Sequence, residues 1–332
     1  MNKRPAALCV LLLFPMAFAC GRSQPKGPPP FRVALLTPGS VADGGWNQAA
    51  YEGLLRIRDE LGAEVNNEET KTPGQFEEGF RDYASRGYQL IFGHGFEYQQ
   101  AAARVAAQYP DTVFITTSGN TVRPNVAPMV FELEQATYLC GVLAGRMSAS
   151  KVVGMIGGID IPSIRSTFLA FRAGAEYAMP AISVREVFTG SFQDSGAAHE
   201  AALALLDAGA DFLIHQANDA GRGVFQAVSE RAGTGAAVYA FGTNKNQNDM
   251  APDVVIASAV LDVPSAFVLV ARRVRDKTFR AEPLRLGMND GTVSFVLNPA
   301  LLSKIPESAR VELGELEEEI RAGSLVVPRG DF

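Results

Sequence analysis

The sequence predicts an α/β protein made of two doubly wound lobes, and three observations lead to this class. The chain has 332 residues, of which 47% are hydrophobic and 20% are charged, an ordinary globular composition. This length exceeds what a single hydrophobic core usually serves, so two lobes are expected. Short apolar runs also alternate with segments of helical periodicity, and strands that are separated by helices form parallel sheets.

The chain begins with the features of an export signal. Two cations, Lys3 and Arg4, precede an apolar run over residues 6–19. A positive start followed by such a run is typical of a secretory signal peptide, and the run is too short to cross a bilayer stably. We expect residues 1–19 to be a signal peptide and leave them out of the predicted fold.

Cys20 directly follows the small residue Ala19, as in the bacterial lipobox, where the cysteine is acylated and becomes the new N-terminus. Ala17 stands where lipoboxes usually carry leucine, so the alternative is a secreted protein with an unmodified Cys20. The segment after it contains four prolines and no large apolar residue, which is typical of a tether. We predict that residues 20–30 form a lipid-anchored tether, which holds the protein at the cell membrane on its extracytoplasmic or periplasmic side.

The predicted elements follow in chain order. Residues 32–37 form an apolar run that ends at a Pro-Gly pair, which predicts a buried strand. Residues 47–62 then place apolar side chains at helical spacing. The same two patterns predict strands from residue 64 and at 89–93, 112–116, 151–156, 182–187, 211–214, 237–241 and 255–260, and helices within 76–87, 99–108, 136–144, 263–274 and 313–320.

Ligands of doubly wound sheets bind beyond the carboxyl ends of the strands, so the loops after the predicted strands are the candidate site. Trp46 and Phe192 fall on such loops in opposite halves and are expected to stack on the two faces of a planar group. The alternative is that both rings only close helix ends against the core. Neighbouring Asp, Asn, Glu and His side chains offer hydrogen bonds. The candidate ligand-binding residues are Asp43, Trp46, Asn47, His94, Phe96, Glu97, Asp160, Phe192, Asn218 and Asn244.

Five motifs stand in a fixed order between about Phe31 and Pro328. They are Asp43-x-x-Trp46-Asn47-Gln48-x-x-Tyr51-Glu52-Gly53, Tyr138-Leu-x-Gly141, Gly157-Gly-x-Asp-Ile-Pro162, Gly190-Ser-Phe192 followed by Asp194, and Leu325-Val-Val-Pro328. In this order they resemble the basic membrane protein family of substrate-binding lipoproteins, which includes purine-nucleoside receptors of ABC importers. The resemblance implies a type I periplasmic-binding-protein fold, whose two doubly wound parallel-sheet lobes close on a ligand. In nucleoside-binding members, aromatic residues at the positions of Trp46 and Phe192 sandwich the base.

The resemblance also implies an interleaved chain and a set of partners. The partners are a small-molecule ligand and the permease subunits of an ABC transporter, with the binding protein itself a monomer. The predicted division is 31–148 and 260–285 for lobe I and 149–259 and 286–332 for lobe II, with passages between the lobes near 147–151, 257–262 and 282–288.

Two positions depart from the nucleoside-binding pattern. Relatives that bind nucleosides usually have an aspartate where Asn244 stands and a lysine near Leu261. Because both charges are replaced together, no unpaired buried charge is expected in the cleft. The ligand is therefore left open between a nucleoside held in another way, a free base and another planar polar metabolite.

Other function classes find little support in the residues. With 30 basic and 36 acidic side chains the net charge is −6, so no nucleic-acid partner is expected. The Gly221-Arg-Gly223 segment lacks the third glycine of a dinucleotide motif, and His199-Glu200 lacks the second histidine of a zinc-protease helix. His94 and His215 are better explained as ligand or packing residues than as an acid–base pair. We predict no catalytic residue, no metal and no cofactor; the alternatives are a ligand-sensing receptor of the same fold and a nucleoside-processing enzyme.

Overall fold

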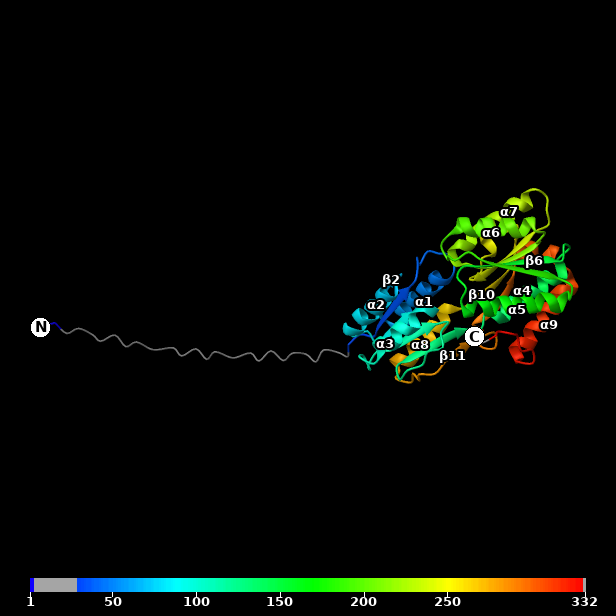
Figure 1. Cartoon of the computed structure of the whole chain (residues 1–332). Coiled ribbons are helices and arrows are strands. Elements are labelled where there is room, and N and C mark those ends of the chain that lie inside the picture. The colour runs from blue at the N-terminus through cyan, green and yellow to red at the C-terminus, as the bar shows by residue number, and fades with distance from the viewer. Residues whose placement is uncertain (3–28, 331–332) are drawn as a thin grey trace. The chain divides into compact units, whose positions relative to one another are not determined.

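The computed structural model describes residues 1–2 and 29–330 (Figure 1). The predicted lipidation site Cys20, nearly all of the predicted signal peptide and most of the predicted tether lie outside the described residues. Within the described ranges, no helix combines the length and the apolar character that crossing a membrane requires.

The first sheet has six strands in the order β11-β5-β4-β3-β1-β2, and all neighbouring pairs are parallel. Helices α1 (Trp46–Leu61) and α8 (Val263–Arg275) pack together on it, as do α2 (Pro73–Ser85) and α3 (Gln99–Ala106). Because helices cover both faces, the inner strands are apolar almost throughout. The strands are β1 (Arg32–Thr37), β2 (Glu64–Glu69), β3 (Leu90–Gly93), β4 (Val113–Thr117), β5 (Val126–Phe131) and β11 (Leu284–Leu286).

The second sheet repeats this plan in the order β12-β10-β9-β8-β6-β7, with only β12 antiparallel to its neighbour. Helices α6 (Ser195–Asp207) and α7 (Gly221–Gly233) lie together on one side of it, and α4 (Glu134–Met147), α5 (Pro162–Ala178) and α9 (Glu307–Ala322) on the other (Figure 1). Its strands are β6 (Val152–Gly157), β7 (Ser183–Phe188), β8 (Phe212–Gln216), β9 (Tyr239–Asn244), β10 (Val255–Leu261) and β12 (Val293–Leu297).

Strands β5, β11 and β12 are absent from the sequence prediction. In β5 the misleading residue is Pro128, since proline cannot donate a hydrogen bond to a neighbouring strand. The carbonyls of Asn125 and Met129 accept hydrogen bonds from the β4 side, so Pro128 between them faces the other way. On that side β11 pairs only from Met129 onward, so the missing N–H interrupts no ladder.

The chain leaves the first sheet earlier than predicted. Helix α4 packs against α5 and α9, so the first passage lies at residues 132–133, before α4, and not at 147–151. The reason is a close contact of helix backbones, because a side-chain carbon on Gly141 would lie 2.0 Å from the carbonyl oxygen of Phe171. Later passages fall at Asp262, between β10 and α8, and at 287–292, between β11 and β12.

Candidate functional site

A cavity of about 810 Å³, measured to include its open mouth, lies where the strands of both sheets end. Small molecules bind at this place in doubly wound sheets, beyond the carboxyl ends of the strands. Segments that follow β1, β3, β4, β5, β6, β7 and β8 contribute to it, as do the last residues of β8, β9 and β10. The lining residues are Pro38, Trp46, Asn47, Gly95, Phe96, Glu97, Ser118, Phe131, Leu133, Ile161, Ser163, Ile164, Thr167, Phe192, Gln193, Gln216, Asn218, Asn244 and Leu261.

Trp46 and Phe192 each have one supported side. The indole of Trp46 stacks on the imidazole of His94 with ring centroids 4.0 Å apart and planes 22° apart. The ring of Phe192 lies against the α-carbon of Gly158, where a side-chain carbon would come within 2.3 Å of the ring. Both rings also line the cavity, so each is fixed from behind and offers a surface to a ligand.

The polar part of the lining contains an acceptor that has no partner. Asn47 is 1% exposed, and its Oδ1 atom has no hydrogen-bond partner among the described residues. A buried polar atom left in this way is costly unless a ligand satisfies it. Three more lining residues have left-handed backbone, namely Ser118 (φ 63°), Asn218 (φ 52°) and Asn244 (φ 68°). Such conformations cluster at ligand sites, where the surrounding structure holds them in place.

Contacts between the two lobes close one side of the cavity. The side-chain oxygen of Asn218 accepts a hydrogen bond from the backbone N–H of Trp46 at 3.1 Å. The ammonium of Lys245 lies 2.7 Å from the carboxylate of Glu52 on α1. The residues that follow β8 and β9 are thereby fastened to the first turns of α1.

Asp43 was predicted to contact the ligand, but it does not line the cavity. Its carboxylate accepts hydrogen bonds from the backbone N–H groups of Gly45, Asn47 and Gln48 at 2.9–3.0 Å. These N–H groups belong to the start of α1, where a carboxylate replaces the missing helical acceptors. Asp43 therefore orients Trp46 and Asn47 from outside the cavity lining.

Replacing Asp43 by alanine should lower the free energy of unfolding by about 1 kcal/mol, the usual loss of a helix cap. It should also weaken ligand binding, because the first turn of α1 carries Trp46 and Asn47. Urea denaturation and a binding titration measure the two effects. Asp43→Asn keeps an acceptor oxygen and should lose less; equal stability and affinity in Asp43→Ala would contradict this role.

His94 is also absent from the cavity lining, because it lies beneath Trp46. It is fully buried, with Nε2 donating to the carbonyl of Trp46 at 3.0 Å and Nδ1 accepting from Thr117 at 3.3 Å. Burial lowers the pKa of His94 to about 3. His215 is equally buried, donates to Gln247 at 3.0 Å, and burial lowers its pKa to about 4. Both histidines therefore support the site as neutral groups.

These two histidines predict a stability that declines in mild acid. Their folded-state pKa values lie below the unfolded value of about 6.5, so the unfolded chain binds more protons as the pH falls below 6.5. Each should reduce the free energy of unfolding by about 1 kcal/mol between pH 7 and pH 5.5. Urea denaturation at both pH values measures this. His94→Gln and His215→Gln should each reduce the pH dependence, because each removes one of the two histidines that are buried in the neutral form.

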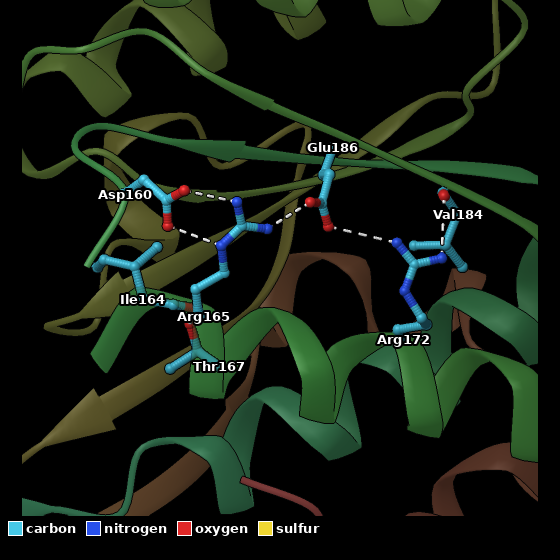
Figure 2. A network of polar contacts seen from close by, with 7 residues as sticks. All are labelled: Asp160, Ile164, Arg165, Thr167, Arg172, Val184 and Glu186. Atoms are coloured by element: carbon cyan, nitrogen blue, oxygen red, sulfur yellow. Dashed lines mark hydrogen bonds and ion pairs between the residues drawn. The ribbon is translucent and has the colours of Figure 1, made fainter. Parts of the chain in front are cut away.

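Asp160 is exposed and takes part in a network outside the cavity lining (Figure 2). Arg165 of α5 donates to both carboxylate oxygens of Asp160, at 2.7 and 2.6 Å, and pairs with Glu186 of β7. The guanidinium holds the pKa of Asp160 below its usual range. Arg172 extends the network to Glu186 and to the carbonyl of Val184. Asp160, which was predicted to contact the ligand, instead connects the loop after β6 to α5 through Arg165. Ile164 and Thr167 of α5 line the cavity.

Several lining residues were missed by the sequence analysis. Ser118 stands just after a predicted strand and could have been found by the rule used for the other loops. Gln193 directly follows Phe192, and Gln216 stands two residues before Asn218, so both lie on loops that were chosen. Thr167 lies inside α5, and nothing in its local sequence distinguishes it from a packing residue. In the described part of the chain, no group of three or more His, Cys, Asp or Glu side chains is placed to hold a metal ion.

Comparison with known proteins identifies the family. Residues 31–325 match the family model described as ABC transporter substrate-binding protein, PnrA-like. The chain belongs to this family. The predicted family membership is thereby confirmed, and the chain is a solute-binding protein of the PnrA-like family of ABC transporters.

Relatives of this PnrA-like protein cover nearly the whole chain. Basic membrane protein A of Borreliella burgdorferi is 27% identical over 337 residues, covering 99% of this chain and 96% of that protein. A purine-binding protein of Brucella abortus is 26% identical and covers 89% of this chain and 82% of its own length. The crystal structure of an ABC transporter solute-binding protein from Aeropyrum pernix K1 matches with a TM-score of 0.82 at 22% identity, covering 91% and 95% of the two chains. The predicted two-lobed fold is confirmed.

Proposed function

We propose that this PnrA-like protein captures a small planar metabolite, a nucleoside or a nucleobase, and delivers it to the permease subunits of an ABC importer. The observation that carries the proposal is the pair of supported aromatic rings, Trp46 and Phe192, on opposite lobes of one cavity. Stacking between two rings suits any flat heterocycle. The purine-binding relative from Brucella abortus gives independent support for a ligand of this kind.

The positions at the ends of β9 and β10 bear on which ligand is captured. Asn244 and Leu261 both line the cavity, on neighbouring strands. The nucleoside-binding pattern usually has an aspartate in place of Asn244 and a lysine near Leu261, and here neither side chain is charged. A ligand that does not depend on ribose contacts, such as a free base, fits this lining, and a nucleoside fits if other groups hold its sugar.

A fluorescence titration tests the proposal without a label, because Trp46 is the only tryptophan in the chain. Purine nucleosides and free bases should change the emission of Trp46 as the ring is covered. A response to bases alone would agree with the lost ribose contacts. If only sugars or aliphatic amino acids bind, the planar ligand is wrong.

We propose binding without turnover. The buried histidines are engaged by Trp46, Thr117 and Gln247, which leaves them poorly placed as an acid–base pair. Incubation of the purified protein with the ligand that binds should return it unchanged by chromatography. Product formation would favour the nucleoside-processing enzyme instead.

We also propose that the mature protein is a monomer anchored through an acylated Cys20, on the extracytoplasmic or periplasmic side of a membrane. The support is the sequence Ala19-Cys20 followed by the proline-rich segment. Cys20→Ser should move the protein from the membrane fraction to the soluble fraction. Cys140→Ala, which changes a thiol buried in α4, is the matched control and should remain membrane-bound. Retention of Cys20→Ser on the membrane would contradict the anchor.

A further inference from the structure

The only charged group in the described lining of the cavity is a carboxylate. Among the described residues that line it, Glu97 is the only ionisable side chain, and no lysine, arginine or histidine joins it. In the described part of the chain, Glu97 has no ion-pair partner within 4.0 Å. Any ligand in the cavity therefore meets a carboxylate that the protein itself leaves uncompensated.

The absence of a side chain at Gly95 leaves room for this carboxylate. A side-chain carbon on Gly95 would come within 2.4 Å of Oε2 and 2.9 Å of Oε1 of Glu97, so the carboxylate folds over a position that only glycine leaves free. Glu97 keeps open surface toward the cavity, while the surrounding protein desolvates the carboxyl enough to raise its pKa. Both oxygens therefore lie over Gly95, which also lines the cavity.

A second acceptor lies in the same lining. The Oδ1 atom of Asn47 has no partner among the described residues, although Asn47 is buried. A carboxylate without an ion-pair partner and a neutral acceptor without a hydrogen-bond partner both favour a ligand that brings hydrogen-bond donors. An anionic ligand would instead be repelled by Glu97 across a partly desolvated cavity.

We infer that Glu97 makes the proposed ligand site selective for planar rings that present two adjacent N–H donors and carry no negative charge. A carboxylate accepts such a pair in a two-pronged arrangement, as it does from the guanidinium of arginine. The Watson–Crick edge of guanine offers this pair without charge, and an amidine offers it with a positive charge. The inference rests on the proposed function and adds to it the residue that chooses among planar ligands.

Two matched ligand sets test the inference on the complete chain. Guanosine and inosine differ by one amino group, and guanosine should bind about 10-fold or more tightly, since hydrogen bonds to charged groups are strong. Benzamidine, benzamide and benzoate have nearly the same shape with positive, zero and negative charge, and should bind in that order. Calorimetric or fluorescence titration gives both sets of affinities.

Three variants test whether Glu97 causes these ligand preferences. Glu97→Gln keeps the volume and should bring the guanosine-to-inosine ratio close to one and remove the charge order of the benzene series. Gly95→Ala should also lower the ratio, because it displaces the carboxylate without changing any charge. Glu78→Gln removes the same charge from an exposed position on α2 and should leave every ratio unchanged.

The outcomes separate this inference from the proposed function. If purines bind but neither ligand set shows a preference, or the preference persists in Glu97→Gln, the role of Glu97 is overturned and the proposed function stands. If no planar ring of either set binds and no free purine base binds, both are overturned. If guanosine binds more tightly than inosine, Glu97 recognises the uncharged pair of N–H donors. If only benzamidine is preferred within its set, Glu97 recognises the cationic pair.

Discussion

Replacing Trp46 by alanine is expected to weaken binding of the planar ligand by about 10- to 100-fold. Stacking of a base on one aromatic side chain contributes roughly 1–3 kcal/mol in nucleic-acid complexes, and each 1.4 kcal/mol is a factor of ten in affinity. Because the change also removes the fluorescent reporter, calorimetry is the suitable measurement. Phe192→Ala should have an effect of similar size, since it removes the opposite ring.

Two milder variants show whether stacking is responsible. Trp46→Phe keeps a flat ring over His94 and should retain much of the lost affinity. Gly158→Ala leaves both rings in the chain but pushes Phe192 from its place, because the added carbon would lie 2.3 Å from the ring. Melting temperatures establish that each variant is folded. Unchanged affinity in both alanine variants would disprove the sandwich.

Replacing Gly141 by alanine is expected to reduce the free energy of unfolding by about 3 kcal/mol, at the upper end of the usual cost of overpacking. The added carbon would lie 2.0 Å from the carbonyl oxygen of Phe171 on α5. Gly174 is placed in the same way, 2.1 Å from the carbonyl oxygen of Tyr138 on α4. Because the obstacles are backbone atoms in helices, they cannot move aside as a side chain would.

Gly314 in α9 offers a matched control for this prediction. It is also helical, but a carbon added there would have no atom within 4 Å. Gly314→Ala should therefore raise the free energy of unfolding, by up to about 1 kcal/mol from helix propensity alone. Urea denaturation of both variants gives the comparison. A similar change in the two would show that the α4–α5 contact is looser than the structure indicates.

The loops after the strands could be predicted because parallel sheets bring their carboxyl ends to one edge. Seven of the ten proposed contact residues line the cavity for this reason: Trp46, Asn47, Phe96, Glu97, Phe192, Asn218 and Asn244. The other three stand on the right loops but have partners that no local pattern reveals. Asp43 accepts hydrogen bonds from the backbone amides of α1, His94 stacks under the ring of Trp46, and Asp160 forms an ion pair with Arg165.

Two of the strands that the sequence analysis missed, β5 and β12, follow the preceding strand with no helix between them, so they break the strand–helix alternation on which the prediction relied. In the sequence, Pro128 of β5 indicates the end of a strand. Only the structure shows that β11 pairs with β5 from Met129 onward, so that Pro128 can be part of the strand. The three residues of β11 are too few to give a clear pattern by themselves. Likewise, the apolar stretch of α4 predicts a helix but does not indicate that its partners are α5 and α9.

The interleaved path of the chain sets the order in which the molecule can be completed during synthesis. The first sheet lacks its edge strand β11 and its covering helix α8 until residue 286 has been made, although its other strands end at residue 131. The second sheet waits still longer for β12 and α9. A growing chain therefore has no finished lobe to release, and both lobes must reach their final form together near the end of translation.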